Sequence, residues 1–278
     1  MSIDPEQTQY VFTQAEFERV RTLLYQHSGI KLNNSKKIMV YSRLSRRLRA
    51  TGISSFQEYL ELVEQDQDQD QSNEWEAFIN SLTTNLTSFF REPHHFPLLH
   101  DHVLALEKKP FRLWCSAAST GEEPYTIAMT LIDAFESYTP PVEIIATDID
   151  TNVLAKARAG VYSLERVEKI PKETLKRFFL KGAGKNSGLV QIRKELRDMI
   201  SFQTLNLLDE QWPIEGPFDA IFCRNVMIYF DKDTQYKILK RFVPMLEPHG
   251  LLFSGHSESL LHAADLFKLR GNTIYELA

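Results

Sequence analysis

Two neighbouring glutamates at the start of an expected helix are the side chains of this chain best placed to do chemistry. Residues 111–125 read FRLWCSAASTGEEPY, an apolar run followed by small residues and then by Glu122, Glu123 and a proline. This order predicts a buried strand, a tight turn and a helix N-terminus. Two capping-box spacings, Ser119 with Glu122 and Thr120 with Glu123, support the helix start. Because ligands of open α/β sheets bind beyond the carboxyl ends of the strands, we expect a ligand site here.

The charge of this turn indicates which ligand it takes. A dinucleotide site needs several glycines and a helix N-terminus that can hold a pyrophosphate. This turn has one glycine and puts Glu122 and Glu123 where the phosphate would lie. Carboxylates there stabilise the helix but repel an anion. A positively charged nucleoside without phosphate is favoured, and S-adenosylmethionine, with its sulfonium and ammonium groups, fits that description. The alternative is that both glutamates only cap the helix.

Polar residues also follow the later strands of the expected sheet. From Arg112 onward strand-like and helical patterns alternate, which predicts a βαβ sheet. Asp148 ends the second strand, where Rossmann-type folds hold ribose hydroxyls, whereas Asp150 is better placed to cap the next helix. The strands expected after the first cover residues 142–149, 199–205, 218–223 and 251–254, and an edge hairpin over 267–277 turns at Gly271-Asn272.

The segment after the fourth strand indicates the kind of nucleophile. Asn225 and Tyr229 stand where the sheet would present side chains next to a sulfonium, a point at which amino-directed DNA methyltransferases carry a proline pair. This chain lacks the prolines and has Arg224, and a cation near the reacting centre suits an anionic nucleophile such as a carboxylate. A carboxylate of pKa about 4.3 is already ionised at neutral pH and needs no general base. In-line attack on a methyl group then depends on positioning and desolvation.

Residues 10–90 read as a separate helical domain. Apolar residues recur at three- and four-residue steps, and glycines interrupt the pattern. We expect a first helix that Gly29 ends, a second over 33–50 that Gly52 closes, a third over 54–63 and a fourth over 75–86. Residues 65–71 read QDQDQDQ and are expected to form an exposed loop without a chemical role. The polar run 83–93 is expected at the junction of two domains, where binding clefts often form.

The second helix carries a basic stripe. Lys36, Arg43 and Arg47 line one side of it and Arg46 lies close by, against a net charge of −5 for the whole chain. One interpretation is a solvated helix face. The sharper interpretation is a docking surface for an acidic partner, because clustered positive charge attracts anions. Nucleic acid is not expected, since the stripe is short, lacks interleaved aromatic residues and belongs to an acidic protein.

Length and composition fit an ordinary globular protein of two domains. The 278 residues are 43% hydrophobic and 25% charged, and Cys115 and Cys223 lie in apolar runs, as core residues do. The histidines between residues 94 and 102 have no cysteine or acidic ligand at metal spacing, so we expect no metal site. We find no signal peptide and no run of the roughly 18 apolar residues that span a membrane. A cytoplasmic monomer is the expectation.

Two segments stand outside the alternating pattern. Residues 161–198 contain GAGKNSG at 182–188 beside apolar residues, which predicts a β-hairpin inserted between sheet elements; a surface loop without function is the alternative. Near the C-terminus, GHSES at 255–259 is expected to be in part a helix cap that Ser257 or Ser259 forms.

Together these segments resemble the chemotaxis receptor methyltransferase family (CheR), from the N-terminal helices to the C-terminus. The resemblance is carried by TNLTSFFREPHHF, CSAASTGEEPY, ATDIDTNVLAKARAGVY, LNLLD, FCRNVMIYF and FSGHSESL, in this order. It implies an α/β fold: a Rossmann-like class I methyltransferase domain over 91–278, with a mostly parallel sheet, a C-terminal antiparallel hairpin and an inserted β-subdomain, after an all-α receptor-docking domain over 1–90. It also implies methylation of glutamate side chains on chemoreceptor cytoplasmic helices by S-adenosylmethionine, which leaves S-adenosylhomocysteine.

The resemblance also implies roles for particular residues. Arg91 and Tyr229 match positions that orient the substrate and the transferred methyl group. Docking on acidic receptor helices is implied for the basic stripe. In some family members the β-subdomain binds a short peptide at the receptor's C-terminus, and the sequence leaves open whether this one does. The cofactor contacts of the family fall on Asn85, Thr87, Arg91, Glu122, Asp148, Asn206, Leu207, Arg224 and Asn225.

Two other functions stay open on the sequence. One is a methyltransferase for nucleic acid or a small molecule, against which the missing proline pair and the acidic balance count. The other is a non-catalytic module that senses S-adenosylmethionine or S-adenosylhomocysteine and binds a receptor. The presence of Arg91, Asn225 and Tyr229 counts against loss of catalysis.

Overall fold

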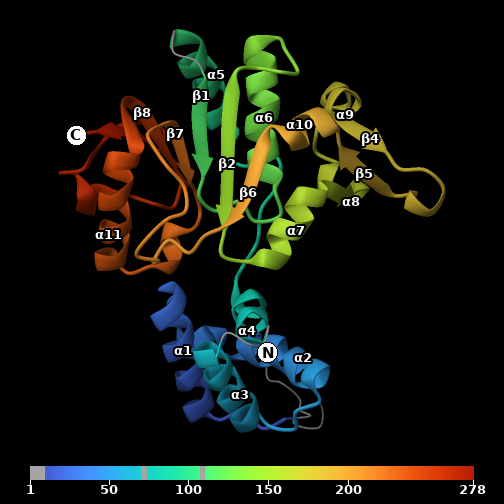
Figure 1. Cartoon of the computed structure of the whole chain (residues 1–278), viewed down its shortest axis with the longest axis vertical. Coiled ribbons are helices and arrows are strands. Elements are labelled where there is room, and N and C mark those ends of the chain that lie inside the picture. Colours follow the sequence, from blue (N-terminus) through green and yellow to red (C-terminus); the bar gives the residue numbers. More distant parts are fainter. Residues whose placement is uncertain (1–9, 70–73, 107–109) are drawn as a thin grey trace. The chain divides into compact units, whose positions relative to one another are not determined.

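The computed structural model describes residues 10–69, 74–106 and 110–278 (Figure 1). The chain divides into two compact units, one made of Met1–Thr84 with Tyr229–Asp231 and the other of Asn85–Ile228 with Lys232–Ala278. The division falls a few residues before the boundary expected at residue 90. Among the described residues, no helix combines the length and the apolar character that crossing a bilayer requires.

The first unit is helical, as the apolar periodicity predicts. Its α1 begins with a capping box, in which the Glu16 N–H donates to the Thr13 hydroxyl (3.2 Å) and the Thr13 N–H donates to the Glu16 carboxylate (2.6 Å). Left-handed Gly29 (φ 67°) and Gly52 (φ 72°) end α1 and α2, which confirms both expected ends. The elements are α1 (Gln14–Ser28), η2 (Asn34–Lys36), α2 (Lys37–Thr51), α3 (Phe56–Gln69) and α4 (Glu74–Leu82).

The expected loop at 65–71 is wrong for its described residues. Helix α3 continues to Gln69, because glutamine and aspartate lengthen a helix without breaking it as glycine or proline would. Asp66 is buried, and its carboxylate accepts hydrogen bonds from the N–H groups of Glu74 (3.0 Å) and Trp75 (2.9 Å). This residue therefore caps α4, a role that the repetitive sequence conceals; residues 70 and 71 lie outside the described residues.

The second unit is built on a seven-stranded sheet in the order β6-β2-β1-β7-β8-β10-β9 (Figure 1). The pairs among β6, β2, β1, β7 and β8 are parallel, and β10 runs antiparallel to both β8 and β9. All expected strands are present, and β8 begins five residues earlier than predicted. The strands are β1 (Phe111–Cys115), β2 (Val142–Asp148), β6 (Ile200–Thr204), β7 (Phe218–Cys223), β8 (Leu246–Ser254), β9 (Phe267–Gly271) and β10 (Ile274–Leu277).

Helices connect these strands. Helix α6 is buried along most of its length, with Tyr125, Ile127 and Leu131 fully enclosed, and packs against α5 and β2. The helices outside the insertion are α5 (His95–Ala105), α6 (Glu122–Phe135), α7 (Thr151–Ala159), α10 (Lys194–Asp198) and α11 (Lys232–Phe242), with short 3-10 turns η5 (Val243–Met245) and η6 (Leu261–Ala263); the turn η4 (Met227–Tyr229) ends in the residue at which the chain re-enters the first unit.

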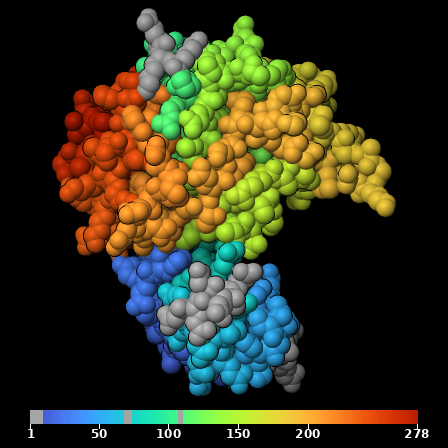
Figure 2. All heavy atoms as spheres, viewed as in Figure 1, coloured from blue at the N-terminus to red at the C-terminus, as the bar shows by residue number. Residues whose placement is uncertain are grey.

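The insertion between α7 and α10 forms a small antiparallel sheet in the order β3-β5-β4, which confirms the expected hairpin and adds a strand. It lies beyond the β6 edge of the large sheet (Figure 1), and the segment between β4 and β5 projects from the surface (Figure 2). Its elements are β3 (Val161–Ser163), α8 (Leu164–Val167), α9 (Lys172–Phe178), β4 (Phe179–Lys181), η3 (Gly184–Asn186) and β5 (Leu189–Ile192).

Candidate active site

The sheet order fixes where a ligand can bind. From β1 the chain adds β2 and then β6 on one side, and it returns to place β7 on the other side of β1. The turn after β1 is tied to both neighbours, because the Ser116 N–H donates to the Phe222 carbonyl (2.9 Å) and the Ala118 N–H to the Thr147 carbonyl (2.8 Å). The carboxyl ends of β1, β2 and β7 thus surround a topological switch point, the usual ligand position in open α/β sheets.

The turn between β1 and α6 is compact, and it does not contain the expected capping boxes. Gly121 precedes the helix with φ 97°, and a Cβ atom there would lie 2.9 Å from both Ala157 Cβ and the Tyr162 hydroxyl. Ser119 also has a positive φ of 48°, and it faces away from the helix start. Its N–H donates to Asp148 Oδ2 (2.8 Å) and its hydroxyl to the Asn85 carbonyl (3.2 Å). The capping expectation is therefore wrong, and Ser119 joins the turn to two predicted cofactor residues.

The two glutamates at the start of α6 have different surroundings. Glu122 is fully buried, and its Oε2 accepts a hydrogen bond from the Thr120 hydroxyl (2.6 Å). Its Oε1 lies 3.6 Å from Arg166 and has no hydrogen-bond donor among the described residues. A buried acceptor without a donor is costly unless a ligand hydroxyl supplies one, so Glu122 fits a nucleoside. Glu123 instead forms an ion pair with Arg224, so its charge is compensated within the protein.

Asp148 stands at the end of β2 as predicted. Its Oδ2 accepts from Ser119 and its Oδ1 from the Asp150 N–H (3.0 Å). Burial raises the pKa of Asp148 to about 6, although these backbone hydrogen bonds favour the ionised form. Asp150 caps α7 through the N–H groups of Asn152 and Val153, which confirms the cap predicted for this residue. The Asn85 amide donates to Asp150 (2.8 Å), so Asn85 is anchored to the same strand end.

Arg224, at the end of β7, is enclosed in a cluster of charges. Its side chain is 0% exposed, and its Nη1 lies 2.5 Å from Glu123 Oε2. Its Nη2 donates to the Arg91 carbonyl (2.5 Å) and lies 3.3 Å from Glu92 Oε2. A buried guanidinium with these partners fixes the backbone around the strand end and compensates two carboxylates. Arg224 is therefore enclosed among partners that the protein itself supplies.

The next residue, Asn225, is held in a left-handed conformation (φ 59°) by Glu258. The Glu258 carboxylate accepts hydrogen bonds from the N–H groups of Asn225 (2.8 Å), Met227 (2.8 Å) and Gly255 (2.6 Å). Glu258 is buried, and the sequence interpretation missed it. The helix cap expected from Ser257 or Ser259 is wrong, because η6 begins after Leu260 without a side-chain cap. No sequence pattern indicates that Glu258, rather than Ser257 or Ser259, binds the backbone at this position.

Glu92 is a second site residue that the sequence interpretation missed. It has a positive φ of 54°, and its carboxylate accepts the His256 N–H (3.1 Å) and the Asn225 side-chain amide (3.3 Å). The His256 ring Nδ1 lies 2.9 Å from Glu92 Oε1. Burial alone would raise the pKa of Glu92, but the His256 hydrogen bonds and the Arg224 charge outweigh it and lower the pKa to about 2. Glu92 is thus ionised and connects the chain before α5 with the ends of β7 and β8.

The other predicted site residues have hydrogen-bond partners of their own. The Thr87 carbonyl accepts from Arg166 (3.0 Å), and the Arg91 side chain donates to the Leu86 carbonyl (2.8 Å). The Asn206 side chain accepts the Leu208 N–H (3.0 Å) after β6, and the Leu207 carbonyl lies 3.3 Å from Arg241 Nη1. Tyr229 is half-buried and belongs to the helical unit, where its carbonyl accepts the Lys31 N–H (2.9 Å).

Two residues of the predicted docking stripe are engaged within the helical unit. Arg43 donates to the carbonyls of residues 81–83 at the end of α4, with the shortest contact, 2.6 Å, to Thr83. Arg47 forms a bidentate pair with Glu74 (3.0 and 2.5 Å). Lys36 and Arg46 are exposed. The stripe therefore consists of two anchoring cations and two exposed cations.

Comparison with known proteins identifies the family of this chain. The family model described as "CheR methyltransferase, SAM binding domain" matches residues 85–275, and "CheR methyltransferase, all-alpha domain" matches residues 15–83. The chain is 53% identical over 264 residues to the chemotaxis protein methyltransferase of Escherichia coli K12, covering 95% of this chain and 91% of the relative. It is 51% identical over 272 residues to chemotaxis protein methyltransferase 2 of Pseudomonas aeruginosa PAO1, covering 97% and 95%.

The fold and the site define a class I methyltransferase whose cofactor is S-adenosylmethionine. Within that class, the chain belongs to the CheR methyltransferase family, which confirms the resemblance stated from the sequence.

Proposed function

We propose that the protein transfers a methyl group from S-adenosylmethionine to glutamate side-chain carboxylates on the cytoplasmic helices of chemoreceptors, which gives glutamate methyl esters for chemotactic adaptation. The observation that carries this proposal is the 53% identity, over nearly the whole chain, to a chemotaxis protein methyltransferase. The protein would act in the cytoplasm, as a monomer.

The surroundings of the switch point support carboxylate methylation. A glutamate carboxylate is ionised at neutral pH and attacks without a general base. The acidic side chains near the end of β7 are engaged within the protein and do not offer a general base. Glu92 and Glu123 lie beside Arg224, and Glu258 accepts hydrogen bonds from backbone N–H groups. The reaction would then depend on orientation and on removal of water, which are the contributions that a preorganised site supplies.

Each predicted site residue has a proposed role. S-adenosylmethionine supplies the electrophilic methyl group. Glu122 and Asp148 would accept hydrogen bonds from hydroxyl groups of the nucleoside, and Asn225 would lie beside the methyl donor. Tyr229 would line the methyl position. The remaining cofactor contacts would come from Asn85, Thr87, Asn206, Leu207 and the segment around Arg91 and Arg224.

Arg91 is proposed to place the substrate carboxylate by charge-assisted hydrogen bonding. The Arg91 side chain is half-exposed and donates only to the Leu86 carbonyl among the bonds described, so its guanidinium has donors to offer. Arg91→Ala is expected to lower the methylation rate by about a hundredfold, the scale of one lost stabilising donor. The protein should remain folded and should unfold at the same denaturant concentration. Full activity in this variant would show that Arg91 does not position the substrate carboxylate.

Two surfaces would bind the receptor. Lys36 and Arg46 offer exposed positive charge to acidic receptor helices. The segment 183–188 between β4 and β5 is exposed and would meet a receptor C-terminal peptide, which would add as a strand to the edge of the small sheet.

Transfer of labelled methyl from S-adenosylmethionine to receptor-containing membranes tests the proposed function. Label on a receptor band that mild alkali removes would establish carboxyl methylation, and receptor variants would then locate the glutamates. Label that survives alkali would point to nitrogen or ether oxygen and would overturn the substrate assignment. Cofactor binding without transfer to any receptor would favour the sensing module.

A further inference from the structure

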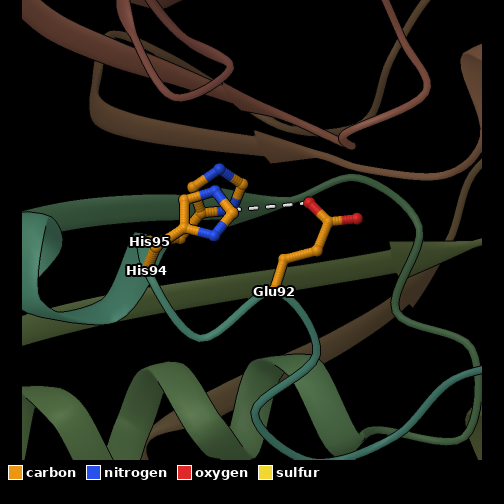
Figure 3. Close-up of side chains that lie close together, drawn as sticks. All are labelled: Glu92, His94 and His95. Atoms are coloured by element: carbon orange, nitrogen blue, oxygen red, sulfur yellow. Dashed lines mark ion pairs between the residues drawn. The ribbon is translucent and has the colours of Figure 1, made fainter.

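Glu92, His94 and His95 bring three metal-ligand side chains together at the start of α5. Their candidate ligand atoms all lie within 4.8 Å of one another, and Figure 3 shows the Glu92 carboxylate facing the two imidazole rings. Two ligands of a tetrahedral zinc ion with bonds of about 2.0–2.1 Å lie about 3.4 Å apart. Small side-chain movements would therefore bring these atoms to coordinating distance. The sequence analysis expected no metal site here and did not consider Glu92, which precedes the histidines by two and three residues.

The protonation of His95 follows from its hydrogen bonds. His95 Nε2 lies 3.1 Å from the Asn272 carbonyl and 3.0 Å from the Thr273 hydroxyl, whose own proton is donated to the Asn272 carbonyl. Both neighbours thus accept, so Nε2 carries the ring proton. A histidine that ligates a metal through one nitrogen usually donates the other N–H to a carbonyl or carboxylate, which fixes its tautomer. His95 has this arrangement already.

The other nitrogen of His95 faces Glu92 without a donor. His95 is 0% exposed, and its Nδ1 has no hydrogen-bond partner among the described residues. Glu92 Oε2 lies 3.9 Å from this nitrogen, a distance drawn as the dashed line in Figure 3. In this tautomer Nδ1 presents a lone pair, and the carboxylate also presents lone pairs. A cation between the two atoms would give the buried Nδ1 the partner that it lacks, which matters because a buried acceptor left alone is costly, and it would share the carboxylate with the donors that Glu92 already has.

We propose that Glu92, His94 and His95 bind a transition-metal dication such as Zn²⁺. Two imidazoles and one carboxylate form a donor set that suits zinc, cobalt or nickel, whereas magnesium and calcium prefer oxygen ligands alone. His94 is exposed and gives an ion access from solvent. Three protein ligands leave a further position for water, the arrangement of an open rather than a purely structural zinc site.

Binding of the ion would change the partners of Glu92. Oε2 of Glu92 lies 3.3 Å from Arg224 Nη2, and the guanidinium would be repelled by a dication. Glu92 also accepts from the Asn225 amide and from His256. An ion bound to this carboxylate therefore competes with Arg224 and Asn225 for its oxygens. The ion pair between Arg224 and Glu123 would remain. The consequence is reversible inhibition that a chelator relieves; this consequence rests on the proposed function of Asn225, whereas the metal binding does not.

Calorimetric titration of Zn²⁺ into the chelator-stripped full-length protein, without cofactor or receptor, tests the site. We expect one ion per chain, no heat with Mg²⁺, and at least about tenfold weaker binding in His94→Ala, the smallest loss typical for damage to a metal site. His100→Ala is the matched control, because His100 lies on the same helix beside Asp101 and outside the cluster. Cobalt(II) absorption should report tetrahedral coordination in the wild type and in His100→Ala, and should be lost in His94→Ala.

The outcomes separate metal binding from its effect on the enzyme. Equal zinc affinity in His94→Ala and wild type, or an equal loss in His100→Ala, would overturn the site. If zinc binds as expected, S-adenosylmethionine affinity is then measured with zinc and with chelator. Affinity that zinc lowers in wild type but not in His94→Ala supports inhibition through Glu92. Unchanged affinity in wild type would leave the metal site standing and overturn the inhibition.

Discussion

Arginines serve different ends in the two units of this protein. In the methyltransferase unit, Arg224 is fully enclosed and lies between Glu123 and Glu92 at the end of β7. In the helical unit, Arg43 and Arg47 are half-buried and brace α4 against α2, while Lys36 and Arg46 are exposed. The enclosed cation maintains a backbone geometry, and the exposed cations are available to another molecule.

The difference shows that a basic residue in a sequence motif indicates a function only together with its burial. A charge without water must be compensated within the protein, and loss of its partner is costly. A charge in water contributes little to stability and is free to act on partners at a distance. Variants of the two kinds should therefore separate stability from recognition.

The largest effect is expected for Arg224→Met. Removal of the guanidinium leaves Glu123 and Glu92 buried without their shared cation, and breaking a buried ion pair costs about 3–5 kcal/mol. The free energy of unfolding, measured by urea denaturation of the second unit, should fall by this amount. Arg46→Met is the matched control in the helical unit and should change stability by no more than about 0.5 kcal/mol. Equal stability of the two variants would remove the distinction between enclosed and exposed cations.

Asp148 should make stability depend on pH. Its folded-state pKa of about 6 lies above the ordinary value of 3.8, so the folded protein keeps this proton to higher pH than the unfolded chain does. The contribution of the group is complete below about pH 3.8 and is lost as the pH rises through 6, a change of about 3 kcal/mol.

Denaturation between pH 4 and pH 7 measures this dependence. Asp148→Asn should flatten the stability profile in that window, and Asp101→Asn, at an exposed position, should leave it unchanged. A wild-type profile that Asp148→Asn reproduces would show that Asp148 titrates normally.

Glu258→Gln should weaken the loop that carries Asn225. Glu258 accepts three backbone N–H bonds, and glutamine has a single acceptor oxygen, so at least one buried N–H loses its partner. We expect a loss of about 1–3 kcal/mol in stability and weaker binding of S-adenosylmethionine in calorimetry. Ser257→Ala, one residue away and exposed, is the control. Normal cofactor affinity in Glu258→Gln would separate this loop from the cofactor site.

The smallest effect on stability is expected for Lys36→Glu combined with Arg46→Glu. Both side chains are exposed, so the unfolding curve and the cofactor affinity should not change. Receptor methylation should fall several-fold, and more strongly at low salt, because surface charges act over a screening length of about 10 Å at 0.1 M.

Arg43→Glu with Arg47→Glu provides the contrast. These changes place carboxylates against the α4 carbonyls and Glu74 and should destabilise the helical unit. If only the Arg43 and Arg47 changes lowered methylation, and did so without loss of stability, the receptor would dock on the face of α2 that carries Arg43 and Arg47.

Much of the fold could be predicted from the sequence because local patterns specify it. A continuous apolar run predicts the fully buried strand β7, and a single glycine predicts the end of α1 and of α2. Asp150 was also predictable as a cap, since its spacing to the helix is short. These features depend on neighbours within a few positions along the chain.

Contacts between distant parts of the chain could not be predicted. Glu92 and His256 are 164 residues apart, and Glu258 binds the backbone of Asn225 from 33 residues away. Such contacts depend on which strands are neighbours in the sheet, and the spacing of residues along the sequence does not indicate this order. The misassigned capping boxes have the same origin, because Ser119 is turned toward Asp148 by the sheet and not by the helix that follows.

The return of residues Tyr229–Asp231 to the helical unit makes that unit discontinuous in the gene. The Lys31 N–H bonds the Tyr229 carbonyl, and the Tyr25 hydroxyl donates to Asp231 (2.7 Å). A fragment that stops at Thr84 would lose both hydrogen bonds, and recombination that exchanged residues up to 84 alone would leave residues 229–231 behind. We therefore expect the helical unit to change by substitution within an intact chain rather than by exchange as a module.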